Sequence, residues 1–267
     1  MSTNLPVTMA SDNAAVKLLD HGLVRLVDHM GSDLSIVRAA RVSYDADWRA
    51  GEDEGSDRRL INYLMKNHHT TPFESVQFTF EVKAPIFVIR QWQRHRTQVF
   101  NELSARYREL PAEYYVPDAI QITTQSSDNK QMRTGEQHAL AQSMHELIRT
   151  QSRQAHEVYH VLVKKGCPRE LARSVLPVNT YSHMFCSLNL HNTFHFLRLR
   201  LHPHAQYEIR VYAEAMLKLI EPIVPVAVAA FRVSLAEVAK WEAFKNTVQY
   251  SNALAAFELS QDPSRNK

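Results

Sequence analysis

The segment SVQFTFEVK, residues 75–83, alternates strictly between apolar and polar side chains. Val76, Phe78, Phe80 and Val82 fall on one side of this pattern, and polar residues fall on the other. Successive side chains of a strand point to opposite faces, so the pattern predicts a strand with one face in the core. We therefore expect a β-sheet at the centre of the fold.

The sequence on either side of this strand adds two more strands and several helices. Residues 22–30 and 180–190 also alternate and are predicted as strands. Helical periods and start or stop signals predict helices ending at Arg41 and before Thr71, starting at Pro85, and covering 133–165, 168–176, 192–201 and 204–221. Loops are expected at 51–57, 94–108, 111–117 and 121–130. The fold class is α+β, with a mixed or antiparallel sheet covered by helices and a long helical segment.

The chain shows no internal repeat and no segment with the composition of a domain linker. We expect a loose N-terminal arm at 1–20, a single α+β domain at 21–245 and a polar C-terminal tail at 246–267. No basic segment followed by an apolar core opens the chain, and no apolar run is long enough to span a bilayer. These features predict a cytoplasmic protein with no membrane partner.

Composition limits the possible functions of the chain. The 267 residues are 45% hydrophobic and 22% charged, as in ordinary globular proteins. A net charge of +3 suits phosphate binding but is too small to indicate nucleic acid as a partner. The two cysteines, Cys167 and Cys186, have no paired spacing, which excludes a disulfide scaffold and favours a reducing compartment. Both are predicted to be structural rather than nucleophilic.

Glycine is scarce, with six residues scattered singly along the chain. Neither the dinucleotide-binding GxGxxG motif nor the GxxxxGK[ST] phosphate loop can be written with them. A nucleotide bound by this protein must therefore be held mainly by side chains.

Residues 90–108, RQWQRHRTQVFNELSARYR, contain five arginines interleaved with three aromatic residues. Guanidinium groups bind phosphate through two parallel hydrogen bonds, and aromatic rings stack on bases. A solvated basic face is the alternative explanation of such a charge run. Asn101, Glu102 and Ser104 add acceptors and donors between the arginines, which favours a nucleotide site.

The same stretch resembles the signature of the flavin-dependent thymidylate synthases, in which RHR is followed after seven residues by Ser, here Arg94-His95-Arg96 and Ser104. Further blocks match that family in the same order and cover roughly residues 20–220. They are RAARVSYD (38–45), TPFE (71–74), KAPIFVIRQW (83–92), PRELARSVLP (168–177) and LRLHPHAQYEIR within 197–210. Several ordered blocks are more specific than any single motif.

The resemblance implies a reaction, a set of cofactors and an assembly. The family converts dUMP to dTMP by reductive methylation, with methylenetetrahydrofolate as carbon donor, FAD as hydride carrier and NADPH as reductant. Its members are α+β proteins that form homotetramers in which subunits share the flavin sites. The scarcity of glycine agrees with a flavin held by side chains.

The resemblance also implies roles for individual residues. The positions that match dUMP-binding residues of the family are Gln91, Arg94, Glu102, Leu103, Ser104, Arg106 and Arg173. Those that match flavin-binding positions are Ser43, Thr71, Glu74, Arg94, His95, Arg96, Asn101, Glu102, Asn189, His191 and His195. Arg200 matches the arginine that hydrogen-bonds the uracil ring and assists its ionisation at N3, so it is the expected catalytic residue.

The chain departs from the family pattern at a few positions. Val99 stands where Ser is frequent, Thr97-Gln98 stand where an apolar and a small residue are common, and His191 stands where Arg is frequent. The last change puts one flavin-phosphate contact in doubt, because a neutral imidazole binds anions more weakly than guanidinium does. Residues 111–140 match no block of the family.

Three alternatives stay open from the sequence. Hydroxymethylation of a uridine monophosphate at carbon 5 would keep the fold but change the product. Non-catalytic nucleotide or RNA binding would use the arginine-rich stretch alone. A metal hydrolase is the third, since His191 and His195 are one helical turn apart, but the intervening residues do not form an HExxH motif, so no metal site is expected.

Overall fold

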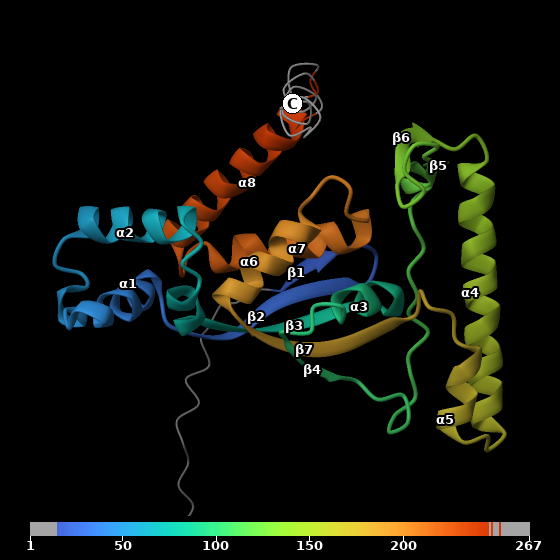
Figure 1. Cartoon of the computed structure of the whole chain (residues 1–267). Helices are drawn as coiled ribbons and strands as arrows, with labels where there is room; N and C mark the ends of the chain where they lie inside the picture. The colour runs from blue at the N-terminus through green and yellow to red at the C-terminus, as the bar shows by residue number, and fades with distance from the viewer. Residues whose placement is uncertain (1–14, 246, 248–250, 252–267) are drawn as a thin grey trace, which may run out of the picture.

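The computed structural model describes residues 15–245, 247 and 251 and confirms the α+β class. Its centre is a five-stranded antiparallel sheet with the strand order β1-β2-β3-β7-β4 (Figure 1). The strands of this sheet are β1 (Val16–Leu18), β2 (Gly22–Met30), β3 (Gln77–Pro85), β4 (Val99–Glu102) and β7 (Tyr181–Asn189). A separate two-stranded hairpin is formed by β5 (Thr123–Gln125) and β6 (Arg133–Gln137).

The helices lie mostly on one face and at both ends of the sheet (Figure 1). The α-helices are α1 (Asp33–Arg41), α2 (Glu54–Lys66), α3 (Ile86–Trp92), α4 (Ala141–Lys164), α5 (Arg169–Ala172), α6 (Leu190–Arg200), α7 (Tyr207–Ile220) and α8 (Pro225–Lys245). Short 3-10 turns are η1 (Val42–Tyr44), η2 (Asp47–Arg49), η3 (Thr71–Ser75), η4 (Ala119–Gln121) and η5 (Arg173–Val175). No described helix combines the length and apolar composition needed to cross a membrane.

The apolar face of β3 is the centre of the main core, as its alternation predicts. Phe78, Phe80 and Val82 are completely buried and pair in register with Leu188, Cys186 and Met184 of β7, which are buried on the same face. The inner sides of α6 and α7 belong to the same hydrophobic cluster. Burial of this face is the main stabilising contribution to the domain.

The opposite face of the sheet is polar and carries cross-strand pairs. Thr79 and Ser187 are hydrogen-bonded at 2.9 Å between their hydroxyl oxygens. Glu81 accepts hydrogen bonds from Arg25 Nε at 2.7 Å and from His183 Nε2 at 2.8 Å. The Glu81 carboxyl is partly buried, which acts to raise its pKa, but its bonds to His183 and Arg25 outweigh this and lower the pKa.

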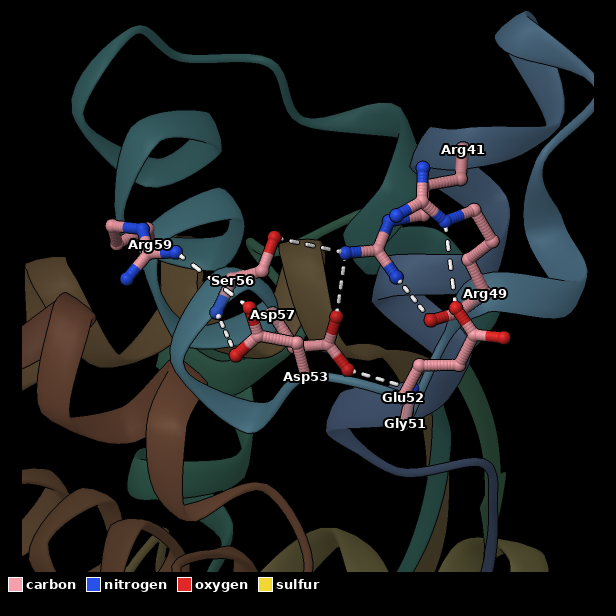
Figure 2. A network of polar contacts seen from close by, with 8 residues as sticks. All are labelled: Arg41, Arg49, Gly51, Glu52, Asp53, Ser56, Asp57 and Arg59. Carbon is pink, nitrogen blue, oxygen red and sulfur yellow. Dashed lines mark hydrogen bonds and ion pairs between the residues drawn. The ribbon is translucent and has the colours of Figure 1, made fainter.

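A buried ion pair joins α1 to α2 and fixes the loop between them (Figure 2). Arg41 Nη2 lies 2.7 Å from Asp57 Oδ1, and Arg41 Nη1 donates to the carbonyl of Arg49 at 2.6 Å. Asp57 Oδ2 in turn accepts from the backbone of Gly51 at 2.7 Å. Asp53 caps α2 by accepting from Ser56 N at 3.0 Å. This network holds residues 42–53 against the start of α2.

The long helix α4 packs beside the sheet rather than on it (Figure 1). Tyr159 of α4 is completely buried in a second cluster with Ala105, Leu110 and Ala172, and its hydroxyl accepts from Leu110 N at 3.1 Å. Gly166 follows the C-terminal end of α4 and has a φ of +83°, a left-handed backbone conformation that glycine adopts without strain. The helix thereby fixes the segment that follows β4.

The structure corrects several expectations at the level of elements. Val16–Leu18, within the expected N-terminal arm, form β1 and pair with β2, while residues 1–14 lie outside the described residues. The expected loop at 51–57 is shorter, because Asp53 caps a helix that begins at Glu54. Most of the expected tail at 246–267 is also outside the described residues.

Three further corrections concern the remaining segments. The helix expected from Arg133 begins only at Ala141, because residues 133–137 form strand β6 and pair with β5. Strand β5 itself lies in the segment 121–130, which was expected to be irregular. The arginine-rich segment 94–108 is not entirely a loop, since Val99–Glu102 form β4 at the edge of the sheet. Helix α8 was not expected at all.

Candidate active site

The arginine-rich motif forms a turn between α3 and the edge strand β4. Trp92, the last residue of α3, is completely buried and stacks on Phe196 at a centroid distance of 4.7 Å. Its Nε1 donates to Gln98 Oε1 at 3.0 Å, which closes the turn. Within the turn His95 is 7% exposed, whereas Arg94 and Arg96 on either side are exposed. The backbone thus directs the histidine inward and the two arginines outward.

A cavity of about 370 Å³ lies between α3, the end of β4 and the α5–η5 segment, and we call it the Glu102 cavity. It brings together Glu102, Leu103 and Arg173, three of the expected substrate-binding residues. Arg90 and Ser182 line the same cavity. Two guanidinium groups, two carboxylates (Glu102 and Glu170) and two serine hydroxyls therefore surround a space of a size suited to a small ligand.

The carboxylate of Glu102 is held in place by two hydrogen bonds. Ser182 Oγ donates to Oε1 at 2.7 Å, and Gln93 Nε2 donates to Oε2 at 3.1 Å. Ser104 accepts from Arg106 N at 3.3 Å, and Arg106 Nε lies 3.6 Å from Glu170, which also lines the cavity. Arg106 and, through it, Ser104 are thus connected to Glu170 of the Glu102 cavity, although neither residue lines it.

Arg200 reaches the motif from the last residue of α6. Its Nε donates to His95 Nε2 at 3.0 Å, and its Nη2 donates to the backbone carbonyl of Gln91 at 3.2 Å. Burial, together with the charges of Arg200 and His195, lowers the pKa of His95 to about 4. His95 is therefore neutral near pH 7, with its proton on Nδ1 because Nε2 accepts.

Burial also lowers the pKa of Arg200. Guanidinium remains charged at neutral pH even so, because its ordinary pKa exceeds 12. A half-buried cation fixed by two acceptors is suited to stabilising negative charge that develops on a ligand. The expected catalytic residue is thus in a chemically suitable place.

Gln91 connects this part of the site to α7. Its side-chain amide donates to Gln206, the residue that precedes α7. Hydrogen bonds thus connect Arg200 to both Gln91 and His95. Gln93, which follows α3, extends this connection to Glu102 by donating to its carboxylate. Expected substrate-binding and catalytic residues from distant parts of the sequence are brought together here.

A second cavity, of about 280 Å³, is lined by histidines and an apolar floor, and we call it the histidine cavity. His191 and His195, expected at the flavin, lie on one side of α6 as their spacing predicts. The lining consists of Leu64, Met65, His68, His69, Thr70, Phe73, His191, Phe194, His195 and Arg198. The rings of His195 and His95 are 6.0 Å apart, so this cavity borders the Arg200 group.

The other expected flavin residues are more dispersed. Thr71 and Glu74 are exposed on η3, next to the histidine cavity. Ser43 is exposed on η1, two residues after Arg41, and Asn101 is exposed on β4. Asn189 has a structural role, since its side chain caps α6 by accepting from Asn192 N at 2.8 Å.

The described cysteines and histidines offer neither a reactive thiolate at Cys186 nor a metal-binding cluster. Cys186 is completely buried, and burial raises the pKa of its thiol to about 12, which makes a thiolate nucleophile unavailable. In the part of the chain that the structure describes, no group of three or more histidine, cysteine, aspartate or glutamate side chains is arranged to hold a metal ion.

Sequence reasoning missed several residues that the fold brings to these cavities. Arg90, Ser182 and Glu170 line the Glu102 cavity, Arg198 lines the histidine cavity, and Gln206 binds Gln91. A signal existed for Arg90, one position before Gln91 in a matching block. Ser182 had none, because its approach to Glu102 depends on the pairing of β7 with β4.

The family model described as thymidylate synthase complementing protein matches residues 25–226 of this chain. A protein of Ehrlichia ruminantium (strain Gardel) named flavin-dependent thymidylate synthase is 49% identical over 216 residues, which are 80% of this chain and 72% of that protein. A protein of the same name from Treponema denticola is 50% identical over 219 residues, 80% of each chain.

Solved structures agree with these sequence relatives. The UMP/dUMP methylase PolB from Streptomyces cacaoi, bound with 5-Br dUMP, superposes with a TM-score of 0.73 at 41% identity. The match covers 82% of this chain and 97% of that one. The same methylase bound with 5-Br UMP gives a TM-score of 0.71 at 40% identity, over 79% of this chain and 94% of that one.

Proposed function

The chain belongs to the flavin-dependent thymidylate synthases, and from that premise we propose how its side chains divide the work of the reaction. The reaction is the reductive methylation of dUMP to dTMP, with methylenetetrahydrofolate as carbon donor and NADPH as reductant. FAD, when bound, supplies the hydride carrier of this reaction. The residue assignments below are supported by the geometry and by the family resemblance.

The nucleotide occupies the Glu102 cavity in this proposal. Arg90 and Arg173 offer guanidinium groups to the phosphate, and Arg106 is connected to the cavity through Glu170. Glu102 is fixed by Ser182 and Gln93, so its remaining acceptor capacity is directed rather than free to rotate. The cavity volume of about 370 Å³ is in the range that accommodates a small ligand.

Arg200 stabilises the uracil ring in this proposal. Carbon 5 of uracil becomes nucleophilic only if negative charge is delocalised over the ring, and loss of the N3 proton provides that charge. A fixed guanidinium beside the ring lowers the free energy of the charged form. The single observation that carries this assignment is the pair of hydrogen bonds from Arg200 to His95 and to the Gln91 carbonyl, which orients the cation.

Neutral His95 is the partner that makes this orientation possible. A protonated imidazole would place two cations 3.0 Å apart, whereas the neutral ring presents a lone pair to Arg200 Nε. Because the pKa of His95 is about 4, the acceptor form is present throughout the neutral pH range. We assign His95 to positioning Arg200, in addition to its expected flavin contact.

The histidine cavity has the chemistry needed to hold part of the flavin. Phe73 and Phe194 give it an apolar floor, and His191, His195 and Arg198 give it donors and positive charge. Thr71 and Glu74 lie next to it on η3. Its volume of about 280 Å³ is too small for a complete dinucleotide, so a flavin held there must extend beyond it.

We further propose a homotetramer in which subunits share the flavin. Arg94, Arg96 and Asn101 are expected flavin residues, but they are exposed. These side chains are placed to reach a flavin that is held chiefly by another subunit. The two free cysteines agree with a cytoplasmic location, where thiols stay reduced.

Product analysis tests the assignment of the reaction. Purified protein with FAD, NADPH and methylenetetrahydrofolate is incubated with dUMP and, separately, with UMP, because the similar methylase carries both nucleotides in its name. We expect dTMP from dUMP by mass spectrometry. A 5-hydroxymethyl product would show carbon transfer without reduction, and no product from either nucleotide would refute the reaction.

A further inference from the structure

Arg198 is a half-buried cation that lies between two cavities. It lines the histidine cavity, and it also lines a larger cavity of about 1000 Å³ between the end of α6, the following loop and α8. Burial lowers the pKa of Arg198, but the ordinary pKa of a guanidinium exceeds 12, so the side chain stays charged at neutral pH. In the part of the chain that the structure describes, no carboxylate forms an ion pair with Arg198. Its charge is therefore available to a ligand.

Helix α8 fixes the orientation of Arg198. Arg198 Nη2 donates to Ser234 Oγ at 3.2 Å, and its guanidinium carbon lies 5.5 Å from the ring centroid of Phe231. Ser234 Oγ itself donates to the carbonyl of Phe231 at 2.7 Å, which leaves its lone pairs for Arg198. Phe231 and Ser234 both follow residue 226, where the match to the family model ends. A part of the chain outside that match therefore positions a cation of the histidine cavity.

The lining of the histidine cavity favours an anion. Positions 191, 195 and 198 follow the helical period, so the side chains of His191, His195 and Arg198 lie on one side of α6. The ten lining residues include Arg198 and four histidines but no carboxylate. Phe194, part of the apolar floor, stacks on Phe231 with ring centroids 4.4 Å apart. The cavity thus combines an apolar floor with one permanent cation.

The charge distribution of FAD decides which part of it suits this cavity. The cavity is too small for a complete dinucleotide, so it holds only a part of the cofactor. FAD carries its negative charge on its two phosphates, whereas the oxidised flavin ring is uncharged. A guanidinium binds phosphate through two parallel hydrogen bonds, and Arg198 is the guanidinium in the lining.

We propose that Arg198 binds a phosphate of FAD and that Ser234 positions Arg198 for this contact. Helix α8 thereby supports the cofactor site through one side chain of α6. This inference rests on the proposed function for the identity of the cofactor.

Removal of the charge at position 198 tests the contact. Arg198→Met keeps an apolar stem against Phe231 but removes the guanidinium, whereas Arg198→Lys keeps a cation. FAD is added to the full chain freed of flavin, and binding is followed by the change in flavin fluorescence. We expect the Kd for FAD to rise about tenfold or more in Arg198→Met, which corresponds to about 1.4 kcal/mol, and to rise less in Arg198→Lys.

Arg232→Met is the matched control for the loss of one positive charge. Arg232 is on α8, pairs with Glu221 at the surface and lines neither of the two cavities. We expect its Kd for FAD to equal that of the wild-type protein.

A second arginine in the cavity shows whether a loss of affinity comes from charge or from packing. His191 lies two helical turns before Arg198 and lines the same cavity. His191→Arg in the Arg198→Met background returns a guanidinium to the cavity. We expect this double variant to recover most of the lost affinity for FAD.

The positioning role of Ser234 is tested by a double-mutant cycle. Ser234→Ala removes the hydrogen bond that orients Arg198, and the Kd for FAD should rise about threefold, as for one neutral acceptor. In the Arg198→Met background the same substitution should have no further effect, because the side chain that Ser234 orients is gone. Equal effects in both backgrounds would contradict the positioning role.

Two results would overturn the phosphate contact. One is an unchanged Kd for FAD in Arg198→Met, including the case in which the KM for another substrate rises instead. The other is an equal loss in Arg198→Met and Arg198→Lys that His191→Arg does not reverse, which would assign the effect to packing. The measurement needs no turnover. If wild-type protein makes no dTMP yet Arg198→Met weakens FAD binding reversibly, the proposed reaction is refuted while the contact is supported.

Discussion

Arg200 and His95 form the central contact of the site, although they are 105 positions apart in the sequence. The family resemblance identified both residues but gave them separate roles, one at uracil and one at flavin. The structure adds their hydrogen bond, which depends on α6 ending beside the turn after α3. No pattern in either segment could have predicted that contact.

Replacement of Arg200 by alanine is expected to abolish dTMP formation without loss of FAD. The variant loses the cation that stabilises the charged uracil but keeps the histidine cavity and the motif arginines. Turnover is measured by product formation, and bound flavin by its visible absorbance in the purified protein. Loss of flavin together with turnover would contradict the assigned role, and Arg200→Lys shows whether charge alone suffices.

His95 makes stability depend on pH in a defined window. Its pKa is about 4 in the folded protein, against 6.5 for an unperturbed histidine. Between these values the unfolded chain binds a proton that the folded chain does not, so stability falls as pH falls from about 6.5 to about 4. Urea unfolding at pH 7 and pH 5 should show a larger loss in wild-type protein than in His95→Gln, and equal losses would contradict this account.

At the scale of elements, the loop between α1 and α2 depends on one buried ion pair (Figure 2). The side chains of Arg41 and Asp57 are 16% and 8% exposed. Asp57→Ala leaves the mostly buried guanidinium of Arg41 without its carboxylate, and because Arg41 keeps its bonds to the Arg49 carbonyl and Ser56, we expect a loss of about 3 kcal/mol in the free energy of unfolding, at the low end for a buried pair. Urea unfolding measures this loss.

Glu52→Ala provides the control for the ion pair. Glu52 pairs with Arg49 at the surface, where the two side chains are 51% and 61% exposed. Such a pair contributes at most about 1 kcal/mol. If Asp57→Ala and Glu52→Ala lower the free energy of unfolding by the same amount, the network of Figure 2 does not hold the loop in place.

The sequence predicted elements well where one physical signal dominated. The strict alternation of residues 75–83 correctly predicted β3, and the alternation of 180–190 correctly predicted β7. Residues 133–137 were assigned to a helix because the amphipathic period of α4 was extended backwards, across residues that instead pair with β5. Strand pairing is a tertiary contact, and a local period does not reveal it.

Helix α8 and strand β4 show two other limits of local reasoning. Pro225 is the first residue of α8, a position where proline is tolerated, but no helix was expected there. β4 lies at the edge of the sheet, where its polar residues Asn101 and Glu102 are expected to contact ligands. Both elements border cavities, so the least predictable parts of the fold are close to the site.

At the scale of the whole molecule, the proposed sharing of the flavin site predicts complementation between subunits. Arg94 is exposed, whereas Arg200 is half-buried in its own chain. If Arg94 serves a neighbouring subunit's site, Arg94→Ala and Arg200→Ala subunits mixed by unfolding and refolding should together regain activity that neither has alone. Each variant refolded by itself is the control, and mixtures that stay inactive would place both residues in the same subunit's site.

An anaerobic single turnover tests the central claim most directly. Protein loaded with FAD is first bleached by NADPH, and dUMP with methylenetetrahydrofolate is then added without further reductant. The account predicts that the flavin absorbance returns and that dTMP forms in proportion to the flavin reoxidised. Reoxidation without dTMP, or a protein that binds no flavin, would contradict it.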